Sequence, residues 1–202
     1  MIRILLAEDQ DMVRGALAAL LALEPDMEVV AQVGCGDEVE AAALSARPDV
    51  ALLDIEMPGI DGIEAAARLR TSLPGCRVLI LTTFGRPGYL TRAMQAGVSG
   101  FLVKDAPAEE LATAIRRALR GERIVDPTLA ATALAVGSSP LTDRERDVLR
   151  AAVEGDTVAD IAAELHLSEG TVRNYLSSTI QKLAARNSKD AAQIAQGNGW
   201  LP

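Results

Sequence analysis

Ile2-Arg-Ile-Leu-Leu-Ala-Glu-Asp9, near the N-terminus, is a short apolar run that ends in two acidic residues. The same arrangement recurs where Val50–Leu53 precede Asp54 and where Phe101–Val103 precede Lys104. Apolar runs of this length, separated by segments with helical periodicity, are typical of the parallel strands of an α/β sheet. Residues at the carboxyl ends of such strands converge on one crevice. The sequence therefore predicts one small site that contains the charged residues following these runs.

Three carboxylates would meet at this site, those of Glu8, Asp9 and Asp54. Two like charges about 4 Å apart repel by roughly 4 kcal/mol at an effective dielectric constant near 20, so this cluster needs a cation. An all-oxygen set of ligands suits Mg²⁺, which keeps several waters and often recruits phosphate oxygens. We expect these three residues to hold Mg²⁺ directly or through water, with the backbone carbonyl of Glu56 completing its shell.

Asp54 would be the nucleophile that takes a phosphoryl group as an acyl phosphate. Lys104 would pair with one phosphoryl oxygen as a point charge. Thr82, at the end of the fourth predicted strand, would offer its hydroxyl group to another oxygen. The alternative is that these polar residues simply face water at strand ends, which is the better interpretation of any one of them alone. Five of them at the correct strand ends favour a single site.

The composition restricts the class of protein. With 202 residues, 49% hydrophobic and 24% charged, the chain has ordinary globular composition and is long enough for one large or two small domains. Apolar runs fall short of the roughly 20 residues that span a bilayer, and the N-terminus lacks a signal-peptide pattern. Cys35 and Cys76 have no metal or redox spacing, so we expect a cytoplasmic protein with two inert thiols. The net charge of −8 argues against a generic polyanion binder.

Five strand-like runs alternate with five helical patterns. The strands are expected at Ile2–Ala7, Met27–Val33, Asp49–Leu53, Arg77–Thr82 and Ser99–Val103. The helices are expected at Met12–Leu23, Asp37–Ala46, Gly62–Thr71, Gly88–Ala96 and Ala108–Arg120. Five βα units predict a doubly wound, five-stranded parallel sheet with flavodoxin-like strand order in residues 1–121. Gly59 and Gly62 permit the turn after Asp54.

Beyond this domain only helical periodicity remains. Residues 122–140 are predicted to be a linker with a short alanine-rich helix, and residues 141–202 an all-α domain. Thr142-x-x-Glu145 is a capping box, and further helix starts are expected at Thr157, Ser168 and Ser188. Two helices joined through His166-Leu167 predict a helix-turn-helix, in which the Ser168–Leu183 helix reads DNA. His166–Lys189 carry four basic residues against one acidic residue, a net charge of +3 in an acidic protein.

These motifs resemble a known family. Residues 1–121 are similar to a response-regulator receiver domain, through Glu8-Asp9, Leu53-Asp-Ile-Glu-Met-Pro-Gly59, Leu81-Thr-Thr83 and Lys104. Lys104-Asp105 resembles the NarL/FixJ branch. Residues 138–202 resemble the LuxR-type helix-turn-helix of that branch, through Leu141-Thr-Asp-Arg-Glu-Arg-Asp-Val-Leu149 and Leu167-Ser-Glu-Gly-Thr-Val-Arg-Asn-Tyr175. A narrower resemblance, to DesR-like regulators of membrane-lipid desaturation, involves residues 81–89 and 170–175.

The resemblance implies a two-component transcription factor. A sensor histidine kinase would phosphorylate Asp54 with Mg²⁺, and the phosphorylated chain would form a homodimer on a double-stranded DNA operator, with membrane-lipid genes as candidate targets. It also implies that Thr82 and Phe101 are coupled: phosphorylation draws the hydroxyl group toward the phosphoryl group and lets the ring turn inward. The alternative for Phe101 is a plain core aromatic.

The predicted DNA contacts lie on the reading helix and comprise Thr171, Arg173, Asn174, Ser177, Ser178 and Lys182. Arg173 and Asn174 are the best base or phosphate contacts, because Arg commonly reads guanine and Asn adenine. Ser177, Ser178 and Lys182 lie one to two turns further on, within reach of phosphates. For Ser178 and Lys182 the alternative is a solvated helix surface.

The first helix predicts a dimer interface. From Gly15 to Leu23 it has no charged residue. At 100° per residue, one face points to the sheet, namely Val13, Ala16, Leu17 and Leu20. The opposite face points away and consists of Gly15, Ala18, Ala19 and Ala22. An exposed stripe of small residues lets another helix approach closely, which favours a symmetric dimer against the helix at Ala108–Arg120 of the partner. The alternatives are the face of the fourth helix and fifth strand beside Phe101, or a merely alanine-rich surface.

Two other functions compete with transcriptional control by phosphorylation. A HAD-like phosphatase also uses an aspartyl nucleophile and Mg²⁺, but its Asp-x-Asp motif usually follows the first strand, whereas Asp54 follows the third. We therefore expect no enzyme activity on an external substrate, beyond removal of the protein's own phosphoryl group. A DNA-binding protein with a degenerate, phosphorylation-independent receiver is the second alternative, and the complete acidic pocket argues against it.

Overall fold

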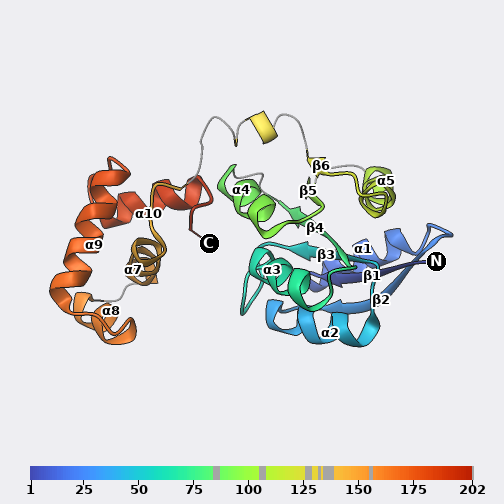
Figure 1. The fold of residues 1–202 in the computed structure, drawn as a ribbon, viewed down its shortest axis with the longest axis horizontal. Helices are drawn as coiled ribbons and strands as arrows, with labels where there is room; N and C mark the ends of the chain where they lie inside the picture. The colour runs from blue at the N-terminus through green and yellow to red at the C-terminus, as the bar shows by residue number, and fades with distance from the viewer. Residues whose placement is uncertain are drawn as a thin grey trace. The chain divides into compact units, whose positions relative to one another are not determined.

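The computed structural model describes residues 1–83, 87–104, 108–125, 129–131, 133, 139–154 and 157–201. The chain divides into two compact units, one of residues 1–85 and 90–132 and one of residues 86–89 and 133–202. The first unit contains the sheet, and the regular elements described in the second are helices (Figure 1). Among the described helices, none is long and apolar enough to cross a membrane.

A parallel sheet forms the centre of the first unit. Its strands are β1 (Ile2–Ala7), β2 (Met27–Val33), β3 (Val50–Asp54), β4 (Arg77–Thr82), β5 (Gly100–Val103) and β6 (Ile124–Val125). They lie in the order β2-β1-β3-β4-β5-β6, and every neighbouring pair is parallel. This order confirms the predicted flavodoxin-like arrangement of the first five strands. The short β6 was not predicted, and it pairs with β5 inside the stretch expected to be a linker.

Helices cover both faces of this sheet. They are α1 (Asp11–Leu21), the 3₁₀ helix η1 (Gly36–Glu38), α2 (Val39–Ala46), α3 (Gly62–Ser72), α4 (Pro87–Ala96) and α5 (Ala108–Leu119). One face packs against α1 and α5, for example through Leu6, Leu52 and Ile115. Leu5 and Leu53 alternate with these residues along their strands and so point to the other face of the sheet, where they are also fully buried. On that side α2 contacts β1 and α3 contacts β3. Because both faces are covered, the strands are continuous apolar runs rather than alternating ones.

The orientation of α1 corrects the predicted one. Leu21 is buried and Leu17 and Ala18 pack against the core, whereas Ala16 and Leu20 are exposed. The prediction had Ala16 and Leu20 facing the sheet and Ala18 facing away. The apolar residues of this helix extend around more than half of its circumference, so its periodicity allows two orientations about 100° apart. The sheet takes the one centred on Leu17 and Leu21.

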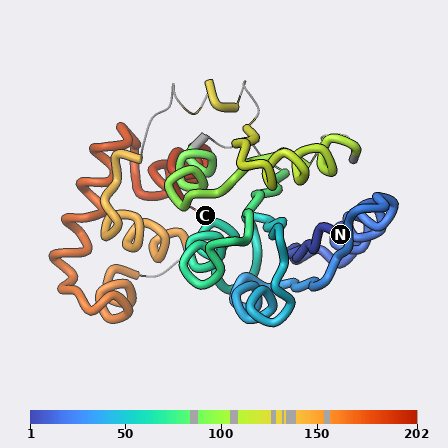
Figure 2. Tube along the Cα trace, turned by 45° about the vertical axis from the view of Figure 1, so that its right-hand side comes forward, coloured from blue at the N-terminus to red at the C-terminus, as the bar shows by residue number. Residues whose placement is uncertain are grey.

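In residues 139–201 of the second unit, as far as they are described, the helices are α7 (Asp143–Glu154), α8 (Val158–Glu164), α9 (Glu169–Lys182) and α10 (Ser188–Gly197). Figure 2 follows them in orange to red along the Cα trace. The predicted caps at Thr157 and Ser168 are confirmed, because each side chain accepts a hydrogen bond from the third residue of its helix. The last helix, α10, begins at Ser188 as predicted, and the side chain of Asn187 caps it by accepting from the N–H of Asp190.

Parts of the predicted linker fall outside the described residues. These are residues 126–128, 132 and 134–138. Residues 129–131 and 133 are helical, in agreement with the short helix expected there.

Candidate functional site

The carboxyl ends of β1 and β3 bring three carboxylates together. Glu8 and Asp9 follow β1, Asp54 ends β3, and one oxygen atom from each lies within 4.8 Å of the others. Glu8 and Asp54 are 1% and 6% exposed, whereas Asp9 is open to solvent. The structure thus collects the three acidic residues that the sequence predicted to share a site.

Lys104, which follows β5, completes the cluster. Its ammonium group lies 2.5 Å from Oε2 of Glu8 and 3.0 Å from Oδ2 of Asp54. The other oxygen of Asp54 accepts a hydrogen bond of 2.8 Å from the backbone N–H of Ile55. The backbone N–H of Lys104 donates to the carbonyl oxygen of Thr82 over 2.7 Å, which fixes the lysine at the end of β4.

The pKa of the Asp54 carboxyl is raised. Burial is the largest cause and the charge of Glu8 adds to it, while the charge and hydrogen bond of Lys104 act in the opposite direction. One ammonium group is therefore insufficient to neutralise two buried carboxylates and Asp9. The all-oxygen donor set, open to solvent at Asp9, fits Mg²⁺.

A tight turn after Asp54 shapes one side of the pocket. A Cβ atom on Gly62 would lie 1.9 Å from the carbonyl oxygen of Asp54, so only glycine permits this approach. Gly59 has a φ of +78°, the left-handed region that favours glycine. Both residues therefore serve the turn, as predicted.

Asp61, next to this turn, was not predicted as part of the site. Its side chain caps α3 by accepting a hydrogen bond from the N–H of Glu64, and it also forms an ion pair of 2.6 Å with Arg92 of α4.

Arg14 of α1 is a second residue that the sequence analysis missed. Its guanidinium group donates to the carbonyl oxygen of Glu8 over 2.5 Å and also pairs with Asp11. A Cβ atom on Gly34 would lie 3.1 Å from Nη1 of Arg14, so the glycine leaves room for this side chain. Nothing in the spacing of these residues indicates the contact, because it depends on how α1 meets the end of β2.

Thr82 and Phe101 lie on neighbouring strands beside the pocket. Both are buried, with 3% of Thr82 and 0% of Phe101 exposed. The burial of Phe101 fits the plain core aromatic as well as the coupled switch residue. The rotation of its ring on phosphorylation stays a prediction.

In the second unit, α9 presents a polar stripe to solvent. Arg173, Asn174 and Ser177 are exposed, as a DNA-reading surface requires, and Gln181 continues the stripe one turn further on, although it was not predicted. Arg173 forms an exposed ion pair of 2.6 Å with Glu169. Thr171 is half-buried, and its hydroxyl group lies 2.8 Å from that of Ser168.

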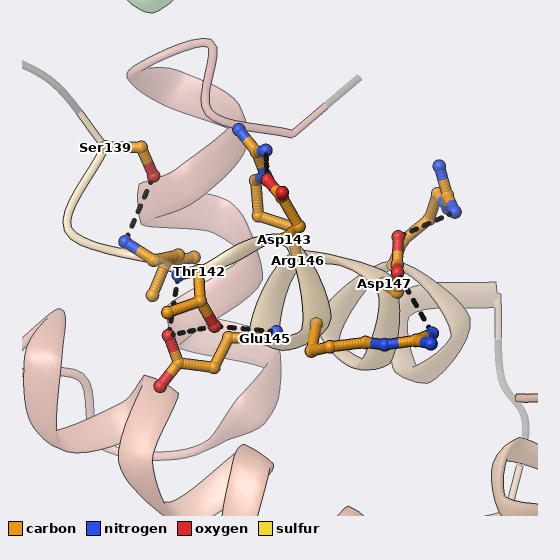
Figure 3. Close-up of polar contacts among 9 residues, drawn as sticks. Ser139, Thr142, Asp143, Glu145, Arg146 and Asp147 are labelled. Atoms are coloured by element: carbon orange, nitrogen blue, oxygen red, sulfur yellow. Dashed lines mark hydrogen bonds and ion pairs between the residues drawn. The ribbon is translucent and has the colours of Figure 1, made fainter. Parts of the chain in front are cut away.

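Ser178 and Lys182 lie beside this stripe but bind Glu145 of α7. The Glu145 carboxylate accepts from the hydroxyl group of Ser178 and from the ammonium group of Lys182, each over 2.7 Å. Glu145 is only 4% exposed and also closes the predicted capping box with Thr142 (Figure 3). Burial raises the pKa of the Glu145 carboxyl, but these hydrogen bonds outweigh it and hold the pKa at about 2. The predicted DNA contacts of Ser178 and Lys182 stay predictions, and each residue has a partner inside the protein.

Comparison with known proteins agrees with both domains. Residues 4–116 match the response regulator receiver domain, and residues 139–195 match the bacterial regulatory proteins of the luxR family. The transcriptional regulatory protein DesR of Bacillus subtilis (strain 168) is 48% identical over 201 residues, covering 100% of each chain. YvfU, an uncharacterised transcriptional regulatory protein of the same strain, is 48% identical over 203 residues, again covering 100% of each.

A solved structure extends the comparison to the fold. The response regulator ChrA of a heme-sensing two-component system matches with a TM-score of 0.58 and 32% identity, over 99% of this chain and 98% of that one. A receiver domain with an acidic pocket is therefore followed by a helix-turn-helix in an order shared with full-length relatives. The chain belongs to the NarL/FixJ-type two-component response regulators, which join a receiver domain to a LuxR-type DNA-binding domain.

Proposed function

We propose that Asp54 is the phosphoacceptor of this regulator, that a sensor histidine kinase supplies the phosphoryl group in the presence of Mg²⁺, and that phosphorylation controls DNA binding. The position of Lys104 carries this proposal, because its ammonium group contacts both Glu8 and Asp54. A lysine that served only to neutralise Glu8 would not need to reach the end of β3.

The chemistry follows from the residues of the pocket. An oxygen of Asp54 attacks the phosphorus atom, a P–O bond to Asp54 forms, and the bond to the donor group breaks. Glu8, Asp9, Asp54 and the carbonyl of Glu56 would hold Mg²⁺, which would neutralise charge on the phosphoryl oxygens. The ammonium group of Lys104 would then exchange a carboxylate oxygen for a phosphoryl oxygen.

Phosphoryl transfer from acetyl phosphate tests the proposal. We expect the intact protein to gain the mass of one phosphoryl group with Mg²⁺ present and to gain none after chelation. Asp54→Asn should gain none, whereas Lys104→Met should react more slowly but still at Asp54. No transfer to the wild type would favour a degenerate receiver, and steady release of phosphate from unrelated esters would favour a phosphatase.

We further propose that the exposed stripe of α9 reads DNA, with Arg173 and Asn174 on base edges and with Thr171 and Ser177 near phosphates. The support is that Arg173, Asn174 and Ser177 share one exposed face of a helix whose opposite face is buried through Val172. Their side chains offer the donors and acceptors that base edges and phosphates require.

The exposed face of α1 is our proposed dimer interface. Gly15, Ala19 and Ala22 are exposed as predicted, and the corrected orientation adds large apolar side chains beside them. Met12 is 86% exposed, Leu20 41% and Leu23 78%. This surface is more apolar than the predicted stripe of small residues, and such surfaces mark protein contacts. Ala18 is half-buried and does not belong to it.

The target genes follow only from the narrower resemblance to DesR-like regulators. We propose genes of membrane-lipid composition, although YvfU is equally similar to this chain and Phe84–Arg86 of the shared motif lie outside the described residues. Genome-wide footprinting of the phosphorylated protein tests this assignment. Binding confined to genes without a link to lipids would contradict it.

A further inference from the structure

Among the described side chains of the second unit, Glu145 is a buried carboxylate that has no place in the proposed chemistry. The side chain of Glu145 is 5% exposed, and both of its oxygens accept hydrogen bonds. Oε1 accepts from Ser178, while Oε2 accepts from Lys182 and from the N–H and hydroxyl groups of Thr142. A capping box requires only the contacts with Thr142, so the two contacts with α9 need a separate explanation.

The two ion pairs of α9 differ in how easily DNA would break them. Arg173 and Glu169 are 62% and 51% exposed, so water can replace either partner. In the second pair Lys182 is 36% exposed but Glu145 only 5%, so the departure of Lys182 would leave a buried carboxylate without its counter-charge. An approaching DNA duplex therefore breaks the Arg173 pair more easily than the Lys182 pair.

We propose that Glu145 is a positioning residue for DNA recognition, which holds Ser178 and Lys182 against α7 and keeps the Lys182 ammonium group from neutralising a DNA phosphate. This role differs from the phosphate contact predicted for Lys182, and it rests on the proposal that α9 binds DNA. Sequence-independent attraction to DNA grows with the number of phosphates neutralised. Keeping one lysine away from the phosphates lowers the affinity for random DNA. Discrimination between DNA sequences then depends on Arg173 and Asn174.

Salt dependence of DNA binding separates the two roles of Lys182. The probe is a random-sequence duplex of about 30 base pairs, titrated with the full-length protein at several salt concentrations. Each neutralised phosphate contributes a slope of about −0.9 to the plot of log K against log salt. We expect Lys182→Met to leave this slope unchanged, whereas loss of a lysine that neutralises a phosphate would flatten it by about 0.9.

Glu145→Gln should have the opposite effect, because the neutral amide releases Lys182. For Glu145→Gln we expect a salt slope steeper by about 0.9 and tighter binding to random DNA. The double variant Glu145→Gln, Lys182→Met should return to the wild-type slope. A flatter slope for Lys182→Met alone, or an unchanged slope for a folded Glu145→Gln, would overturn the proposal. If Glu145→Gln does not fold, the Lys182→Met result still decides.

A measurement without DNA distinguishes failure of this inference from failure of the proposed function. Trp200 is the only tryptophan of the chain and packs beside the core of the second unit, so its fluorescence reports unfolding of that unit. The effect of Glu145→Gln on the folding equilibrium constant is measured twice, in the wild type and in Lys182→Met. If Glu145 holds Lys182, the factor by which Glu145→Gln lowers this constant should be at least about fivefold smaller in Lys182→Met. Additive effects of the two substitutions on stability would contradict the contact proposed between Glu145 and Lys182. Coupled effects in a protein that binds no DNA would contradict only the proposed function.

Discussion

Asp54 shares its pocket with a second buried carboxylate, and the ammonium group of Lys104 balances only part of their charge. Replacing Asp54 with Asn removes one of these charges and leaves Lys104 paired with Glu8. Active sites commonly retain such a cost in stability. We therefore expect Asp54→Asn to raise the free energy of unfolding of the receiver by on the order of 1 kcal/mol without Mg²⁺.

Calorimetry of the full chain checks this prediction. Added Mg²⁺ should stabilise the wild type more than the variant, because the variant lacks one ligand. Asp9→Asn is the matched control, since Asp9 is exposed and its charge costs less. A receiver transition that falls below the wild-type temperature in Asp54→Asn without Mg²⁺ would show that charge crowding does not strain this site.

Glu145 makes the stability of the second unit depend on pH. Its pKa lies at about 2 instead of the ordinary 4.5, so the folded state favours the ionised carboxylate. The resulting stabilisation is complete above pH 4.5 and is lost as the pH falls toward 2. We expect it to be on the order of 1 kcal/mol, because Lys182 is partly screened by solvent.

Urea unfolding followed by Trp200 fluorescence measures this effect between pH 6 and about 2.5. Glu145→Gln should lose less stability than the wild type over this range, because it has no proton to take up at this position. Other carboxylates titrate in both proteins, so only the difference between them reports Glu145. Parallel pH profiles of the two proteins would rule out the depressed pKa.

Among the helices, α1 carries the proposed dimer interface. Leu20 of α1 and Leu44 of α2 are 41% and 42% exposed, which makes them a matched pair. Leu20→Arg should abolish the phosphorylation-dependent dimer, because a charge would be buried against the partner, whereas Leu44→Arg should dimerise normally. Sedimentation of both phosphorylated variants checks this. Normal dimers of Leu20→Arg would place the interface elsewhere, with the face of α4 and β5 as the next candidate.

The exposed stripe of α9 predicts which residues determine sequence preference. Asn174→Ala should weaken operator binding by about 1–3 kcal/mol while leaving binding to random DNA almost unchanged, because a base contact is lost. Gln193→Ala, at an exposed position of α10, should change neither affinity. Competition binding against a random duplex makes the comparison. Equal losses on both DNAs would assign Asn174 to the phosphate backbone.

At the level of elements, the sequence predicted the strand order, the capping box at Thr142 and the acidic pocket, because each depends on local patterns or on the topology of parallel strands. It did not predict the face of α1, since an alanine-rich helix allows more than one orientation. It also missed β6, which has only two residues. The left-handed backbone of His166, with a φ of 54°, had no signal in the sequence.

Several contacts that the sequence did not predict at the two sites join residues of different elements. Arg14 meets Glu8 only after α1 docks, and Asp61 meets Arg92 only after α4 docks. As a basic residue on the predicted reading helix, Lys182 was expected to contact DNA phosphates. Its partner in the structure is Glu145, 37 residues away in α7. Periodicity and spacing describe one element at a time, so such pairs become visible only in the folded chain.

The whole molecule carries a net charge of −8, which opposes approach to DNA. A single α9 stripe with one exposed arginine gives little electrostatic attraction to offset it. Under the proposed function, tight binding requires two such stripes on one operator, which phosphorylation would supply by driving dimerisation. The acidic pocket and the reading helix are then two parts of one switch.

One measurement tests this central claim most directly. Operator affinity is measured for the wild type and Asp54→Asn, each with and without acetyl phosphate and Mg²⁺, on a site selected in vitro from random DNA. We expect the phosphoryl donor to tighten binding of the wild type by at least about tenfold, equivalent to 1.4 kcal/mol, and to leave Asp54→Asn unchanged. Equal affinity of the wild type with and without the donor, once phosphorylation of Asp54 is verified by mass, would contradict the account.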